Sequence, residues 1–146
     1  MAVLAQLFAA THTQALARAD ALDAGRDPGA AEPHVGLPGL TALELEVLGE
    51  IAARAVRFGT GDLEAADVDL DHDQLQRMPA FWTEVMAELA APEDPEAPDD
   101  VARAWAASEE MGEPDTDLLP RVRAVAALAA QAREAGLDLY VWSPAD

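Results

Sequence analysis

The run Asp67-Val-Asp-Leu-Asp-His-Asp73 is the segment of this sequence best suited to bind a metal ion. Alternating carboxylates can chelate Ca²⁺ or Mg²⁺, and in an extended segment they would share one face. A calcium loop counted from Asp67 would need Gly at its sixth position and Glu at its twelfth, which here are His72 and Met78. Two interpretations stay open, a metal site and a solvated strand edge or loop, and the spacing favours the second. The candidate metal ligands are Asp67, Asp69, Asp71, His72 and Asp73.

Other motifs that support catalysis or cofactor binding are missing from the sequence. His12, His34 and His72 are the only histidines, and no two of them have the spacing of a helical metal site. The pair Gly59 and Gly61 lacks the Lys of a phosphate-binding loop. The chain has no Cys, which excludes disulfides, thiol catalysis and Cys-ligated zinc. We therefore expect no cofactor and favour a non-enzymatic role.

The charge of the chain limits its partners. Asp and Glu number 28 against nine Arg and no Lys, which gives a formal net charge of −19. Proteins bind nucleic acids and anionic membranes mainly through Lys and Arg that neutralise phosphates. The sequence therefore predicts no nucleic-acid partner and no membrane partner, whereas a basic protein is a suitable one.

Length and hydrophobicity predict one folded domain over residues 1–146. The chain is 51% hydrophobic, which is too apolar for a disordered protein despite its charge. The first ten residues are apolar but lack the basic region of a secretory signal, and no run reaches the roughly 20 apolar residues of a membrane span. These features predict a soluble, cytoplasmic protein.

Capping signals and hydrophobic spacing predict the positions of the helices. Thr11 with Gln14, and Thr41 with Glu44, have the form of capping boxes that begin helices. Gly59 suits the end of the second of these helices. Helices are expected over residues 11–24, 41–58 and 79–90, from the cap at Asp99 to 112, and from 116 or 117 to 135. Loops are expected over residues 26–39 and 91–100.

The two ends of the sequence predict strands. Residues 2–9 form a short apolar run, and residues 137–142 alternate and are rich in β-forming side chains. Because an isolated strand leaves its backbone donors and acceptors unpaired, we expect the two segments to pair, with a third strand from residues 63–70. The predicted fold is a helix-rich α+β domain with a small sheet formed by strands near the two termini; the alternative is an all-α fold.

This order of elements resembles the uncharacterised bacterial YfbM-like family. The residues that carry the resemblance are Leu4 to Leu16, a short strand followed by a Thr-capped helix, and Leu128 to Trp142, a helix, a Gly and a β-rich strand. The resemblance implies a bacterial source and a similar architecture. It implies no activity and no catalytic residue.

Aromatic residues are few, so their positions are informative. Trp82 and Trp105 lie in or beside apolar helical stripes, which is typical of core residues. Tyr140 and Trp142 lie two residues apart on one face of the last strand. They either rest against the helices or form an exposed aromatic patch, which would be a candidate surface for partner binding.

The sequence favours a protein-interaction role, as a small regulator or an immunity-type inhibitor whose acidic face meets a basic protein. The alternative is an enzyme or metal-dependent binder that uses residues 67–73. A third interpretation is DNA mimicry, which requires carboxylates spaced like phosphates along a surface.

Overall fold

The chain folds into a helix-rich α+β structure. The computed structural model describes residues 5–29, 32–37, 39–57, 59, 61–112 and 117–144. The predicted fold class is confirmed, and the alternative of an all-α fold is wrong. In chain order the elements are β1 (Gln6–Ala10), α1 (His12–Asp23), β2 (His34–Gly36), α2 (Ala42–Val56), β3 (Ala66–Asp67), β4 (Leu75–Arg77), α3 (Ala80–Ala90), α4 (Ala97–Ala106), α5 (Leu119–Ala135) and β5 (Asp138–Trp142).

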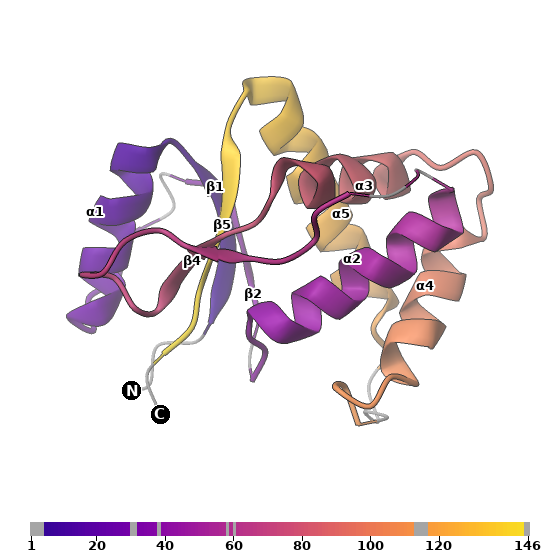
Figure 1. Cartoon of the computed structure of the whole chain (residues 1–146), viewed down its shortest axis with the longest axis horizontal. Helices are drawn as coiled ribbons and strands as arrows, with labels where there is room; N and C mark the ends of the chain where they lie inside the picture. Colours follow the sequence, from indigo (N-terminus) through magenta and orange to yellow (C-terminus); the bar gives the residue numbers. More distant parts are fainter. Residues whose placement is uncertain are drawn as a thin grey trace.

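The first and last strands lie side by side at the centre of the sheet. The strand order is β2-β1-β5-β4-β3, and all neighbours are antiparallel. Gln6 lies opposite Trp142 and Ala10 lies opposite Asp138, so β1 and β5 pair along their whole length. Figure 1 shows β5 in yellow beside β1 in indigo. The predicted pairing of the two terminal segments is confirmed for residues 6–10; residues 2–4 of the predicted strand lie outside the described part of the chain.

The two faces of the sheet pack against different helices (Figure 1). Leu7, Leu139 and Val141 face the larger core, which includes residues of α2, α3, α4 and α5. Phe8 and Tyr140 face the smaller core beneath α1. This division follows from the period of two in a strand, which points neighbouring side chains to opposite faces. The central strands are buried on both sides for this reason.

Two predicted capping boxes are present. The Gln14 backbone N–H donates to Thr11 Oγ1 at 3.2 Å, and the Thr11 backbone N–H donates to Gln14 Oε1 at 3.0 Å. Thr41 and Glu44 form the same kind of motif at the start of α2. Each box satisfies backbone donors that have no partner inside the helix, which explains why α1 and α2 begin where the sequence predicts.

Several helix boundaries differ from the predicted ones. Helix α2 ends at Val56, and its C-cap is Arg57, whose φ of 54° is left-handed, whereas the sequence predicted Gly59 as the cap. Helix α4 begins at Ala97 with Pro98 in its first turn, so Asp99 lies inside the helix and does not cap it. It ends at Ala106, and turns follow it.

Two short strands lie where the sequence predicts none. Strand β2 lies within the predicted loop over residues 26–39, and β4 follows the acidic run. The predicted third strand over residues 63–70 is reduced to the two residues of β3, which pair only with β4. Strands of two or three residues have too little periodicity to be recognised locally, and distant partners stabilise them.

Two tryptophans join α3 and α4 to α2 inside the larger core. The Trp82 indole N–H donates to the carbonyl oxygen of Leu45 at 2.8 Å, and the Trp105 indole N–H donates to that of Glu44 at 3.0 Å. Both side chains are fully buried, as predicted. Within the described residues, no helix is both long and apolar enough to span a membrane.

Candidate functional site

The acidic run that the sequence singled out lies against α1. His72 Nδ1 lies 2.7 Å from Asp69 Oδ1, and His72 Nε2 lies 2.8 Å from Asp20 Oδ1 on α1. The run therefore bonds to itself and to α1. Among the described residues, no group of three or more His, Asp or Glu is arranged to hold a metal ion. The candidate metal ligands Asp67, Asp69, Asp71, His72 and Asp73 therefore stay a prediction.

The two carboxylates change the protonation of the imidazole. Hydrogen bonds to Asp69 and then to Asp20 raise the pKa of His72 above its usual value. The hydrogen bond from His72 is also the largest cause that lowers the pKa of Asp69. Asp20 precedes His72 by 52 residues, and no sequence pattern relates the two, so sequence reasoning missed this contact.

The aromatic pair on β5 is buried. Tyr140 is 1% exposed and Trp142 is 3% exposed, and both belong to the smaller core under α1. The Tyr140 ring stacks on Phe8 with ring centroids 5.8 Å apart, and the Trp142 indole N–H donates to Asp23 Oδ1 at 2.9 Å. The two side chains therefore rest against α1, which was one of the two interpretations, and form no exposed aromatic patch.

A small cavity borders Tyr140 at the edge of this core. Its volume is about 90 Å³, and its lining includes His12, Asp67, Val68 and Arg77. The Tyr140 hydroxyl is buried without a hydrogen-bond partner among the described residues, and burial raises its pKa.

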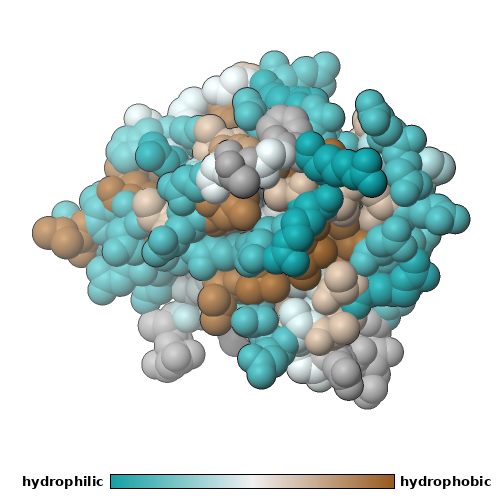
Figure 2. All heavy atoms as spheres, turned by 45° about the vertical axis from the view of Figure 1, so that its right-hand side comes forward, coloured by the Kyte–Doolittle hydropathy of each residue, from teal (hydrophilic) through white to brown (hydrophobic). Residues whose placement is uncertain are grey.

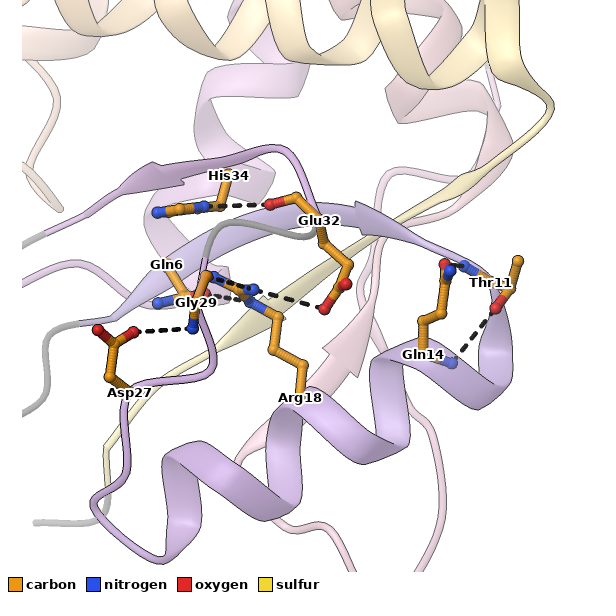
Figure 3. A network of polar contacts seen from close by, with 8 residues as sticks. All are labelled: Gln6, Thr11, Gln14, Arg18, Asp27, Gly29, Glu32 and His34. Atoms are coloured by element: carbon orange, nitrogen blue, oxygen red, sulfur yellow. Dashed lines mark hydrogen bonds and ion pairs between the residues drawn. The ribbon is translucent and has the colours of Figure 1, made fainter.

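A buried arginine joins α1 to the sheet and to the following loop (Figure 3). Arg18 is 2% exposed, and its Nε donates to Gln6 Oε1 at 2.6 Å. Its Nη1 donates to the carbonyl oxygen of Gly29 at 3.1 Å and lies 3.4 Å from Glu32 Oε1. The guanidinium also stacks over the Phe8 ring, 5.2 Å from the centroid. These contacts use much of the hydrogen-bonding capacity of Arg18, so we assign it a structural role.

A hollow at the surface lies where α2 ends and α4 begins. Its volume is about 460 Å³. We call it the acidic hollow, and it combines carboxylates with apolar walls and one arginine. Such a lining suits the side chain of an arginine or a lysine, whose stem is apolar and whose head is cationic. The lining residues are Ala55, Val56, Arg57, Glu88, Pro92, Glu93, Asp94 and Ala97.

The acids of the hollow differ in what they already bind. Glu88 Oε1 lies 3.2 Å from Arg133 Nη1, which neutralises part of its charge. Asp94 Oδ1 accepts the backbone N–H of Glu96 at 2.9 Å, and its second oxygen makes no hydrogen bond or ion pair with the described residues. Glu93 is exposed and makes no hydrogen bond or ion pair with any residue that the structure describes. Glu93 and Asp94 are therefore the groups available to a cation.

Sequence reasoning predicted a solvated connector here but not a hollow. The composition of residues 91–100, with its prolines and acids, signalled an exposed segment. Figure 2 turns the right-hand side of Figure 1 forward and shows a mostly hydrophilic face with apolar strips between the polar side chains. The opposing wall from Ala55 to Arg57 lies more than 30 residues earlier, so only the packing of α2 against α3 and α4 forms the hollow.

Most of the acidic side chains have no cationic neighbour. Within the described residues, four carboxylates lie within 4 Å of an arginine, and three of these pairs are largely exposed. Exposed pairs contribute at most about 1 kcal/mol each. The repulsion that accompanies a net charge of −19 is therefore only slightly offset by pairing. The four carboxylates belong to Glu32, Glu50, Glu88 and Asp100.

We predict that the melting temperature rises between low salt and 1 M NaCl. The Debye length falls from about 10 Å at 0.1 M salt to about 3 Å at 1 M, so repulsion among unpaired carboxylates is screened. Thermal melts followed by circular dichroism at several NaCl concentrations measure the effect. An equal concentration of an uncharged osmolyte controls for changes in solvent alone. A melting temperature that stays constant or falls would contradict this account of the charge.

No family model, curated protein or solved structure matches this chain, so the resemblance to the YfbM-like family stays a prediction.

Proposed function

We propose that this chain is a non-enzymatic protein-interaction module, of the regulator or immunity type, that binds a basic protein partner. The observation that carries the proposal is the acidic hollow, in which unpaired carboxylates lie beside apolar walls. In the proposed complex the hollow receives an arginine or lysine side chain of the partner. The partner must be a protein with a basic surface, because the chain carries 28 acids against nine arginines.

The lining of the hollow matches both parts of such a side chain. Ala55, Val56 and Pro92 offer apolar surface to the aliphatic stem. Glu93 and Asp94 offer carboxylate oxygens to the guanidinium or ammonium group, and a charge-assisted hydrogen bond is about twice as strong as a neutral one. The overall negative charge also speeds the approach of a basic partner.

A second hollow extends the same surface. It measures about 370 Å³ and shares Pro92 with the acidic hollow, so both hollows border the connector between α3 and α4. Its lining is mainly apolar and contains three prolines. Protein interfaces commonly combine an apolar centre with charged or polar groups around it. The lining residues are Leu89, Ala90, Pro92, Pro95, Pro98, Arg123 and Ala127.

The double variant Glu93→Gln with Asp94→Asn should weaken binding of a basic peptide about three- to tenfold, since it removes two charges from the rim of the hollow. The probe is a fluorescent peptide of alternating arginine and glycine, and its anisotropy is measured at 0.15 M salt. Asp94→Asn keeps the acceptor oxygen that the Glu96 backbone N–H uses, so α4 should begin as before.

The matched control is Glu109→Gln with Glu110→Gln. These exposed acids follow α4 at the end away from the hollow, and the substitution changes the net charge by the same amount. We expect the control to weaken binding less than twofold. If both variants lose the same affinity for the peptide, binding depends only on the total charge of the protein. That result would overturn the assignment of the hollow as the binding site. Duplex DNA of similar length should not bind at this salt concentration.

A further inference from the structure

We propose that a groove beside α2 is a second docking surface, which receives a basic amphipathic segment of a protein partner. The groove measures about 310 Å³ and lies between the outer face of α2 and the chain that leads to β3. It shares no described lining residue with the acidic hollow, so the proposal does not depend on the hollow. We call it the α2 groove, and its described lining residues are Leu43, Glu46, Val47, Glu50, Leu63 and Glu64.

The apolar part of the α2 groove includes a leucine that the protein's own cores leave uncovered. Leu43 is 55% exposed and belongs to neither core cluster. Val47, one turn later, and Leu63, on the opposite wall, are partly buried against the larger core. The three side chains line one groove, so apolar surface continues from the core out to solvent. Apolar patches with polar rims are typical of binding surfaces.

Contacts between the two walls fix the shape of the groove before a partner binds. The Ala65 backbone N–H donates to Glu46 Oε2 at 2.7 Å, which ties the chain before β3 to α2. Leu63 approaches α2 at Gly49, where a Cβ would lie 3.4 Å from Leu63 Cδ2. A site whose walls are already in place loses little conformational entropy when a ligand enters it.

The charged residues of the α2 groove are all acidic. Glu46, Glu50 and Glu64 supply three carboxylates, and the described lining contains no cation, whereas the acidic hollow contains Arg57. Glu50 pairs with Arg54 of its own helix, a weak interaction because both side chains are exposed. The Glu64 carboxylate makes no hydrogen bond or ion pair with the described residues. Such a lining complements an apolar side chain that is flanked by arginines or lysines.

The spacing of the lining residues on α2 favours a helical occupant. The four residues from Leu43 to Glu50 are spaced i, i+3, i+4 and i+7, so apolar and acidic side chains alternate along one stripe of the helix. An amphipathic helix presents its anchors with the same period. A second copy of this chain is excluded as the occupant, because three glutamates of each copy would face one another and each copy carries a net charge of −19.

The test measures binding of a labelled helical peptide that carries leucines on one face and arginines on both sides of them. Fluorescence anisotropy at 0.15 M salt gives its affinity. Leu43→Gln should weaken binding about three- to tenfold, because it removes apolar surface that a leucine of the peptide covers. A peptide with serines in place of the leucines has the same charge and should bind Leu43→Gln and the wild type equally, which isolates the apolar contact.

Glu64→Gln tests the charged part of the groove. It should weaken binding of the same peptide about two- to fivefold, because it removes a carboxylate that faces an arginine. A peptide with glutamines in place of the arginines should bind Glu64→Gln and the wild type equally. Glu109→Gln removes the same charge from an exposed acid outside the groove, and its effect should be smaller than that of Glu64→Gln.

Leu70→Gln is the control for the loss of an exposed leucine. Leu70 is 96% exposed and does not line the groove, so this variant should bind the leucine peptide as the wild type does. Near-ultraviolet circular dichroism shows whether each variant folds. Wild-type affinity in Leu43→Gln, or equal losses in Leu43→Gln and Leu70→Gln, would overturn the proposal.

Two further measurements separate other occupants and sites. A wild-type dimer in sedimentation velocity that Leu43→Gln dissociates would overturn the proposal, because a second copy would then fill the groove. A loss in Glu93→Gln with Asp94→Asn but not in Leu43→Gln would place the peptide in the acidic hollow. That result would overturn the assignment of the α2 groove and leave the function proposed above intact.

Discussion

Deletion of residues 137–146 is expected to leave a chain that does not fold cooperatively. Strand β5 is the central strand of the sheet and pairs with both β1 and β4, so its loss leaves two separate strand pairs, β1 with β2 and β3 with β4. Four large side chains that are at most 3% exposed are removed with it. Burial of each contributes roughly 1.5–3 kcal/mol, whereas a whole domain is stable by about 5–15 kcal/mol. These side chains are Leu139, Tyr140, Val141 and Trp142.

The measurement compares near-ultraviolet circular dichroism and thermal melts of the full chain and a chain that ends at Gly136. A chain that ends at Pro144 keeps all of β5 and serves as the control, which should melt close to the full-length protein. If the chain ending at Gly136 melts cooperatively within a few degrees of full length, β5 is not a core strand and the described sheet is wrong.

Gly49→Ala is expected to destabilise the fold by about 2–4 kcal/mol, although alanine normally favours a helix by about 1 kcal/mol over glycine. A Cβ at position 49 would overlap the Trp82 ring, at 2.5 Å from Nε1. Trp82 lies on α3 and is fully buried, and its indole N–H donates to the carbonyl oxygen of Leu45 on α2, the helix that contains Gly49. The ring must then move, which strains the core and breaks a buried hydrogen bond.

The matched control is Gly36→Ala on the edge strand β2, where a Cβ would meet nothing within 4 Å. Its stability should stay within about 0.5 kcal/mol of the wild type. Urea unfolding followed by tryptophan fluorescence gives the free energy of unfolding for each variant. A Gly49→Ala protein as stable as the Gly36→Ala protein would contradict the close packing of Trp82 on α2.

The helices with clear capping signals were predictable because their signals are local. Thr11 and Gln14 lie within one turn, and so do Thr41 and Glu44, so each helix start depends on residues that are close in the sequence. Gly136 ends α5 with a φ of 70°, a conformation that glycine adopts without strain. The alternation of residues 137–142 likewise predicts a strand with two different faces.

The sequence by itself thus determined the fold class, the main helices, the pairing of the two terminal segments and the excess of negative charge. Only the tertiary structure decided the short strands β2 and β4, the burial of Tyr140 and Trp142 beneath α1, and the acidic hollow. It also decided that His72 contacts Asp20 and that Arg18 reaches Gln6. Periodicity and capping report interactions within about one helical turn. Contacts between residues far apart in the chain arise only when the elements pack, so no local pattern records them.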